Sequence, residues 1–267
     1  MKTRNFVRFA VVFSTMAMLL FAFGSVGAVT NGEFDGNGHP YVGLMVAQDI
    51  DGTPLWRCSG TLISPTVYLT AGHCTEAPAV SAQIWFASDV ESEIPGNGYP
   101  FSGDVGGTTH VHPEFYDAPF FVHDVGVVVL DEPVFMSTYG TLPGVDSLDQ
   151  LKTQRGQQDV TFTAVGYGLQ RISPVFVEAE RVRMVAYPHL IQINVPGFTG
   201  DFSLLLSNNH STGGTCFGDS GGPNFLGNSN VVAGVTSFGI NGNCAGTGGV
   251  FRMDRQNVLD FVNSFLD

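Results

Sequence analysis

The stretch "GTCFGDSGGPN" (residues 214–224) places Ser220 between glycines, with Asp219 before it and Cys216 four positions upstream. A serine in this setting is either an activated nucleophile or part of a polar, glycine-rich turn. Because a serine hydroxyl is a weak nucleophile near neutral pH, the first interpretation needs a base within hydrogen-bond reach. The rest of the chain has to supply that base and a group that orients it.

The sequence around this stretch is typical of an all-β protein. Short apolar runs rich in β-branched and aromatic residues alternate with Gly, Pro, Asn and Asp. The runs predicted as strands are 41–47, 59–64, 66–72, 82–88, 125–130, 160–168, 231–239 and 248–253. Only the segment 254–266 has a helical period, and Asp254 is its predicted N-cap. The apolar face of this helix comprises Val258, Phe261, Val262, Phe265 and Leu266.

The G-x-S-x-G pattern around Ser220 also occurs in α/β-hydrolases, where the acid and the histidine follow the serine. The last histidine of this chain is His210, so none follows Ser220. Chain order and the all-β pattern both exclude that fold. The opposite order is present, since His73 ends one apolar strand, Asp124 begins another, and Ser220 comes last.

In this order the chain resembles the trypsin/chymotrypsin-type serine proteases, and in particular a secreted bacterial member. The resemblance spans the sequence after residue 28. It rests on "VTNG" (29–32), "CSGTLIS" (58–64), "TAGHC" (70–74), "HDVGVVVL" (123–130), "AVGYG" (164–168), "CFGDSGGP" (216–223), "TSFG" (236–239) and "GVF" (249–251). It implies two packed six-stranded antiparallel β-barrels with a C-terminal α-helix, the first barrel within 29–150 and the second within 151–267.

The resemblance also implies the roles of a serine endopeptidase. Ser220 would be the nucleophile, His73 its general base, and Asp124 the group that holds the imidazole. The backbone N–H groups of Gly218 and Ser220 would form the oxyanion hole. His123 adjoins Asp124 but is expected to point to the opposite face of its strand.

The resemblance places the floor of the substrate pocket at Gly214. It places the walls at Thr215, Ser237, Phe238, Gly239 and Gly249. None of these residues carries a carboxylate, so a Lys or Arg side chain would be buried there without a partner. We therefore expect cleavage after large apolar or aromatic residues. The alternative is a catalytically silent member of the family that serves as a binding protein, although all three catalytic residues are present.

Residues 1–28 have the pattern of a signal peptide, with a basic start, an apolar run at 9–23 and small residues before Ala28. An uncleaved membrane anchor is the alternative. Cleavage after Ala28 would release a secreted protein, extracellular or periplasmic. The resemblance implies that the freed amine of Val29 forms an activating ion pair with Asp219.

The chain has a formal net charge of −13, which opposes binding to nucleic acid and to anionic membranes. We expect a monomer that acts on protein or peptide substrates without a cofactor or metal ion, and we interpret the acidic loop 87–98 as solvated. The four cysteines indicate disulfides in an oxidising compartment, with three pairings possible. The resemblance implies the pairs Cys58–Cys74 and Cys216–Cys244.

Overall fold

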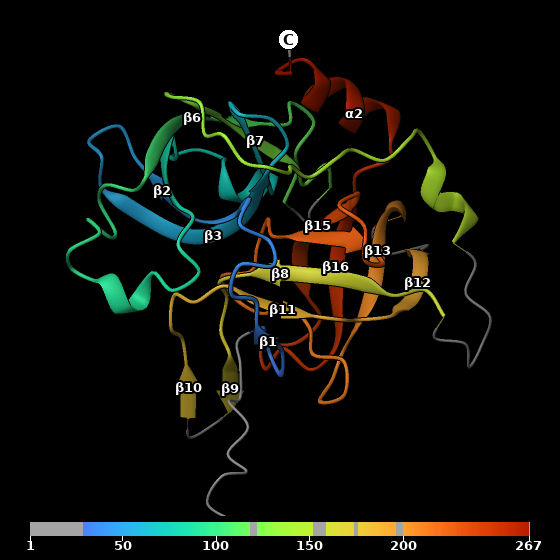
Figure 1. Cartoon of the computed structure of the whole chain (residues 1–267). Helices are drawn as coiled ribbons and strands as arrows, with labels where there is room; N and C mark the ends of the chain where they lie inside the picture. The colour runs from blue at the N-terminus through green and yellow to red at the C-terminus, as the bar shows by residue number, and fades with distance from the viewer. Residues whose placement is uncertain (1–28, 118–121, 152–158, 174–175, 196–199, 267) are drawn as a thin grey trace, which may run out of the picture.

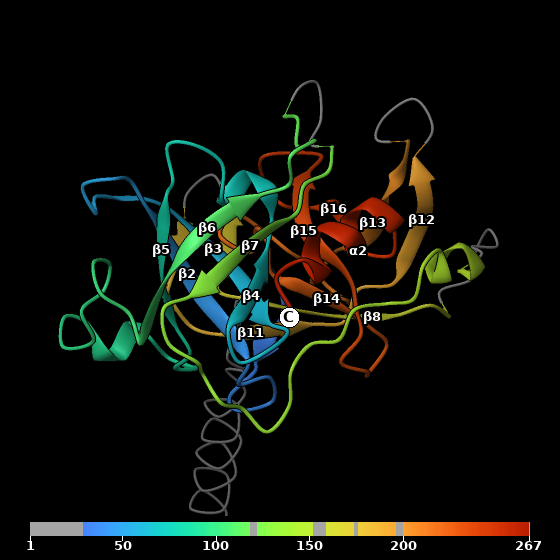
Figure 2. The same ribbon diagram turned by 90° about the horizontal axis from the view of Figure 1, so that it is seen from above.

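The computed structural model describes residues 29–117, 122–151, 159–173, 176–195 and 200–266. The predicted signal peptide, 1–28, lies outside the described residues. Within the described ranges, no helix has both the length and the apolar character needed to cross a membrane. Figure 1 shows the N-terminal half, blue to green, beside the yellow-to-red C-terminal half, and the turned view in Figure 2 shows the same arrangement.

Six strands of the N-terminal half close into an antiparallel barrel in the order β2-β3-β4-β7-β6-β5. These strands are β2 (Val42–Gln48), β3 (Pro54–Leu62), β4 (Val67–Thr70), β5 (Ser81–Trp85), β6 (Val105–Val111) and β7 (Gly126–Leu130). The 3-10 turns are η1 (Gly72–Cys74), η2 (Glu91–Glu93) and, after the barrel, η3 (Ser147–Gln150). Every residue of β2 and β4 is buried, because the barrel interior covers one face and neighbouring chain covers the other.

The C-terminal half is a curled eight-stranded sheet in the order β1-β11-β8-β14-β15-β16-β13-β12. Its strands are β1 (Glu33–Phe34), β8 (Phe162–Gly166), β11 (Met184–Ala186), β12 (Leu190–Val195), β13 (Gly200–Asn208), β14 (Pro223–Leu226), β15 (Val232–Gly239) and β16 (Gly246–Arg252). A separate hairpin pairs β9 (Arg171–Ser173) with β10 (Phe176–Glu178). The predicted all-β class is confirmed, but only the first half forms a closed six-stranded barrel. In the second sheet, β1 and β12 are the two edges of the described strand order.

Two terminal segments pack on the half to which they do not belong in sequence. Strand β1 pairs with β11, matching Glu33 to Val185. Helix α2 (Gln256–Asn263) reaches the N-terminal barrel, where the ring of Phe261 lies 5.0 Å from that of His112. The strands of the closed barrel lie within 42–130, and those of the second sheet lie within 162–252 except for β1.

The predicted N-cap of α2 is wrong. Arg255 occupies that position, and no side chain caps the helix. The Asp254 carboxylate instead accepts hydrogen bonds from the Arg252 guanidinium at 3.0 and 2.8 Å and from the Leu148 N–H at 2.8 Å. A buried arginine is a stronger donor to a carboxylate than an exposed helix N–H, and this difference explains the outcome.

One hydrophobic core runs through both halves. The same cluster of buried side chains includes Leu44 and Ile84 of the barrel together with Val235 and Phe251 of the second sheet. The two halves are therefore held against each other by apolar packing, which fixes side chains that project from either half toward their junction.

Candidate active site

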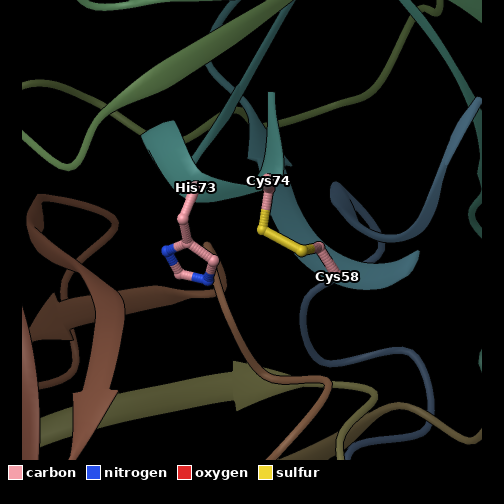
Figure 3. A group of neighbouring side chains, drawn as sticks. All are labelled: Cys58, His73 and Cys74. Carbon is pink, nitrogen blue, oxygen red and sulfur yellow. A yellow bond between two sulfur atoms is a disulfide. The ribbon is translucent and has the colours of Figure 1, made fainter. Parts of the chain in front are cut away.

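His73 lies on η1, the 3-10 turn that follows β4. The next residue, Cys74, forms a disulfide with Cys58 of β3, with 6.3 Å between the two Cα atoms. Figure 3 shows the imidazole and the disulfide projecting from neighbouring positions of this turn. The turn is thereby tied to the barrel wall, while the His73 side chain keeps 16% of its surface exposed.

Asp124 is fully buried and faces His73. Its carboxylate accepts the backbone N–H of His73 at 2.9 Å and the ring Nδ1–H of the same residue at 2.9 Å. The Ser237 hydroxyl, from β15 of the other half, donates to the Asp124 Oδ2 atom at 2.5 Å. Because a carboxylate can only accept, Nδ1 carries a proton and the Nε2 atom of a neutral His73 is left as the acceptor.

The electrostatic surroundings of His73 raise the pKa of its imidazole. Desolvation by burial is the largest influence and favours the neutral ring, but the charge of Asp124 and the hydrogen bond to it outweigh that penalty. Glu76 adds a further attraction. This is the arrangement in which an imidazole can take up a proton during a reaction and have the resulting charge stabilised.

Ser220 lies in a turn whose backbone only glycine adopts readily. Gly218 has φ +94° and Gly221 has φ +77°, and a Cβ on Gly221 would lie 2.6 Å from the Ser59 carbonyl oxygen. Ser59 of β3 holds the turn, since its N–H donates to the Ser220 carbonyl at 2.8 Å and its hydroxyl donates to the Gly218 carbonyl at 2.9 Å. The first half thus fixes the position of the candidate nucleophile on the second half.

The backbone N–H groups in this turn divide into two sets. Those of Asp219, Gly221 and Gly222 donate to carbonyl groups of the turn or of β15. Among the hydrogen bonds of the described residues, none uses the N–H of Gly218 or of Ser220. These two groups are the ones that the sequence resemblance assigned to an oxyanion hole.

A cavity of about 490 Å³ opens beside this turn, and both His73 and Ser220 line it. Four of the predicted pocket residues line it as well, namely Thr215, Ser237, Phe238 and Gly239. Other residues that line the cavity were not predicted from the sequence: Asn208, Phe217, Ile240, Cys244, Thr247 and Gly248. The side chains of Phe217 and Ile240 are more than half exposed, so the mouth of the cavity is apolar.

Gly214 and Gly249 are not among the residues that line this cavity. A Cβ on Gly249 would lie 2.3 Å from the ring of Phe238, which covers that glycine. A Cβ on Gly214 would lie 2.3 Å from Cγ of Asn208. The register of β15 against β16 explains the first difference, because Phe238 pairs with Gly249 and Gly239 pairs with Gly248.

Asp219 is fully buried next to the serine. Its carboxylate accepts the N–H of Gly168 at 2.8 Å and that of Cys216 at 2.8 Å. Burial nevertheless raises the pKa of Asp219 to about 6, against the lowering effect of these two bonds and of the Arg57 charge. This carboxylate therefore lacks a fully compensating cation.

The start of the described chain lies close to this region. Val29 is fully buried with Met184 and Ala186, and the next residue, Thr30, accepts the N–H of Gly214 at 3.1 Å. The nitrogen of Val29 belongs to a peptide bond in the full chain and carries no charge. An ion pair between Val29 and Asp219 therefore stays a prediction for a chain cleaved after Ala28.

The second disulfide joins Cys216, four residues before Ser220, to Cys244, with 5.3 Å between Cα atoms. Both disulfides are the ones that the resemblance implied. Cys58, His73 and Cys74 also have ligand atoms close enough together for a metal ion. Since the two cysteines are bonded to each other, they offer no thiolates for that purpose.

His123 faces away from the candidate site. Its Nδ1 atom contacts the Glu114 carbonyl at 3.1 Å, and its ring stacks on His112 with 4.9 Å between centroids. The loop 87–98 is not simply solvated, because Glu91 pairs with Arg181 at 2.8 Å. That partner lies far away in sequence, so no local pattern signals it.

Comparisons with known proteins agree with this geometry. The family model described as Trypsin matches residues 33–262. Brachyurin of Leptuca pugilator is 30% identical over 195 residues, which cover 71% of this chain and 79% of that protein. Collagenase of Hypoderma lineatum is 24% identical over 253 residues, which cover 89% of this chain and 90% of that protein.

Among solved structures, HL collagenase has a TM-score of 0.68 and 22% identity, and the match covers 88% of this chain and 97% of that chain. At this identity the match shows the fold alone. The relatives are animal proteins, so they support the family but not the bacterial source that the sequence resemblance suggested.

Proposed function

The chain belongs to the trypsin family, and from this premise we propose that it is a secreted serine endopeptidase. The observation that carries the proposal is the hydrogen-bonded series Ser237–Asp124–His73, which ends at a cavity that Ser220 also lines. In this series the carboxylate is buried and satisfied, and the imidazole presents a basic nitrogen toward the cavity side.

The proposed reaction proceeds through an acyl-enzyme. His73 Nε2 takes the proton of the Ser220 hydroxyl as its oxygen attacks the scissile carbonyl. The N–H groups of Gly218 and Ser220 stabilise the negative oxygen of the tetrahedral intermediate. The intermediate collapses, the C–N bond breaks, and His73 gives the proton to the leaving amine. Water then attacks the ester with the same base, and Ser220 regains its proton as the acid product leaves.

We propose that export activates the enzyme. Removal of residues 1–28 would convert the Val29 nitrogen into an ammonium group, and Asp219 is a buried carboxylate that needs a cation. The bridge between Thr30 and Gly214 already brings the segment alongside the chain that leads to Ser220. The resulting ion pair would fix the turn that carries the oxyanion hole.

The composition of the cavity supports cleavage after large apolar or aromatic residues. Phe217, Phe238 and Ile240 supply apolar surface, and no residue among the described ones that line the cavity has a carboxylate. A buried Lys or Arg side chain would lose its hydration without gaining an ion pair, which is costly. The protein would act on protein or peptide substrates outside the cell as a monomer.

The experiment that tests the proposal measures the intact mass of the secreted protein before and after a serine-directed organophosphonate. We expect the mass of 29–267 with both disulfides, and one adduct. The Ser220→Ala variant should take no adduct, whereas Ser229→Ala, which removes an exposed hydroxyl elsewhere, should be labelled like the native protein.

The competing function is a catalytically silent binding protein of the same family. It predicts the processed mass with no adduct and no peptide cleavage. A mass that retains residues 1–28 together with full labelling would contradict activation by export, while leaving the assignment of the nucleophile intact.

A further inference from the structure

Asp124 lies at the centre of a tight three-residue turn just before β7. The Val125 N–H donates to the His123 carbonyl at 2.8 Å, which closes this turn around the aspartate. His123 itself has φ +52°, a left-handed conformation that residues other than glycine adopt at a cost. Such a conformation persists where the surrounding structure holds it, and it often occurs beside functional groups. The contacts of His123 therefore bear on how the Asp124 carboxylate is aimed.

The His123 side chain is held on several sides. Its ring stacks on that of His112, with 4.9 Å between centroids and 10° between the ring planes. The ring of Phe202, from β13, lies edge-on to it at 4.9 Å. Its Nδ1–H donates to the Glu114 carbonyl at 3.1 Å, since a carbonyl can only accept. With 13% of the side chain exposed, this histidine is confined, and so is the peptide that joins it to Asp124.

The neighbouring ring of His112 extends these contacts to the C-terminal helix. His112 is buried after the end of β6, and its backbone N–H donates to the Val125 carbonyl at 3.1 Å. Its ring lies 5.0 Å from that of Phe261 on α2. Four side chains thus form one continuous ring row, namely Phe261, His112, His123 and Phe202. The ring row ties the turn around Asp124 to α2 and to the second sheet.

We propose that His123 is a positioning residue, whose ring, held in the ring row, directs the Asp124 carboxylate toward His73. The inference rests on the proposed endopeptidase function and adds to it a residue outside the hydrogen-bonded series. The carboxylate meets both the backbone N–H and the Nδ1–H of His73 at 2.9 Å. A misplacement of about 1 Å in a catalytic group can cost about 10²-fold in rate. His123 does not line the substrate cavity, so it acts through Asp124.

The test uses His123→Asn, because asparagine also tolerates a positive φ but has no ring to join the ring row. We expect kcat per titrated active site to fall by about 10- to 100-fold, with little change in KM. The midpoint of the rise of kcat/KM with pH should fall toward the ordinary value of about 6.5, because a misdirected Asp124 supports the charge of His73 less. A loss of stability alone would change neither quantity.

A second variant, Phe202→Leu, removes a neighbouring ring without altering the chain next to Asp124. It should lower kcat by about threefold and shift the pH midpoint in the same direction. Combined with His123→Asn, it should lower kcat no further, because the ring that it supports is already absent.

The matched control is His39→Asn. His39 is also a stacked histidine, since its ring lies 5.5 Å from that of Phe225 with 13° between planes, and its Nδ1 atom contacts the Asp35 carboxylate at 2.6 Å. Among the contacts of the described residues, none joins His39 to the turn around Asp124. Both kcat per active site and the pH midpoint should keep their native values in this control.

Native values of kcat and of the pH midpoint in His123→Asn would overturn the positioning role, and continued cleavage would leave the proposed function standing. Additive losses in the double variant would overturn the role of the ring row. Absence of both cleavage and organophosphonate labelling in the native protein would instead overturn the proposed function. If His123→Asn does not fold, Phe202→Leu decides: a lower kcat with a lower pH midpoint supports the proposal, and native values of both overturn it.

Discussion

Asp124 and Asp219 are both fully buried beside the candidate active site, but their surroundings differ. Asp124 accepts hydrogen bonds from a backbone N–H, an imidazole and a hydroxyl, the last two from side chains that the fold already holds in place. Among the described residues, Asp219 accepts hydrogen bonds from two backbone N–H groups, and burial raises its pKa to about 6.

Folding alone supplies the partners that stabilise the charge of Asp124. The charge of Asp219 is left to be balanced by a later event. The surroundings of Asp124 are supplied by β15 and η1 of the folded chain. Asp219 has the hydrogen bonds but only a partial balance of charge, and the N-terminal segment that begins at Val29 is packed nearby. Changes to either carboxylate or to its partners should therefore have different effects.

The largest effect is expected for Asp124→Asn. An amide NH₂ next to Nδ1 would favour the wrong tautomer of His73, so kcat should fall by about 10⁴-fold with little change in KM. Steady-state kinetics on a peptide substrate measures this. Asp117→Asn, which alters an exposed carboxylate of the neighbouring loop, is the control and should keep nearly full activity. A large loss of kcat in Asp117→Asn with little loss in Asp124→Asn would show that Asp117, and not Asp124, is the acid that acts on His73.

The next effect concerns the N-terminus. A chain that keeps Gly27 and Ala28 before Val29 should have kcat/KM roughly 10²–10³-fold below that of the 29–267 chain, comparable to loss of an oxyanion donor. Active-site titration followed by kinetics compares the two preparations. Equal activity would mean that Asp219 does not need the Val29 ammonium group.

The free energy of unfolding should depend on pH differently in the unprocessed chain and in the 29–267 chain. The carboxylate of Asp219 has a folded-state pKa of about 6, above its ordinary value of 3.8. The unprocessed fold therefore keeps the proton longer than the unfolded chain, and it loses stability as pH rises from about 4 to about 6. In the 29–267 chain the new ammonium should offset this loss. Urea unfolding should show a gap that widens by about 2–3 kcal/mol across that window. A gap independent of pH would contradict the pairing.

Ser237→Ala should have a smaller effect. It removes the hydroxyl that donates to Asp124 at 2.5 Å and leaves one lone pair of a buried carboxylate unpaired. We expect kcat to fall about tenfold. Ser203→Ala is the control, since its buried hydroxyl has no hydrogen-bond partner among the described residues. An equal loss in both variants would indicate a general effect of removing a buried hydroxyl.

The smallest effect is a shift of the pH profile. Protonated His73 cannot accept the serine proton, so kcat/KM should rise with pH as the imidazole deprotonates. Because Asp124 raises the pKa of His73, the midpoint should lie above the ordinary value of about 6.5. In Asp124→Asn the residual activity should have a lower midpoint. An unshifted midpoint in that variant would show that Asp124 does not act on His73 through its charge.

The sequence predicts the all-β class, the order of the site residues and the terminal helix, because these depend on local periodicity and on short motifs. It places Gly214 and Gly249 wrongly relative to the cavity. Their positions depend on the register of β15 against β16 and on the Asn208 side chain from a different strand. The hydrogen bond from Ser237 to Asp124 was missed for the same reason, since it joins two distant strands across the junction of the halves.

The second half is a curled sheet and not the expected closed barrel, and β1 lies at its edge by pairing Glu33 with Val185. This pairing has no signature in the two residues of β1. The predicted cap of α2 is wrong because the Asp254 carboxylate accepts hydrogen bonds from buried Arg252, two residues earlier, and from the Leu148 N–H, which is far away in sequence.

Strand β1 and helix α2 each pack on the half to which they do not belong in sequence, and this affects the order in which contacts form during synthesis. Strand β1 emerges from the ribosome long before its partner β11, and the residues of the first barrel that α2 covers wait until residues 256–263 have been made. Contacts so distant along the chain close slowly, since loop entropy must be overcome first. The candidate active site takes His73 and Asp124 from the first half and Ser220 from the second. A partly translated chain would therefore hold His73 and Asp124 without a correctly placed Ser220.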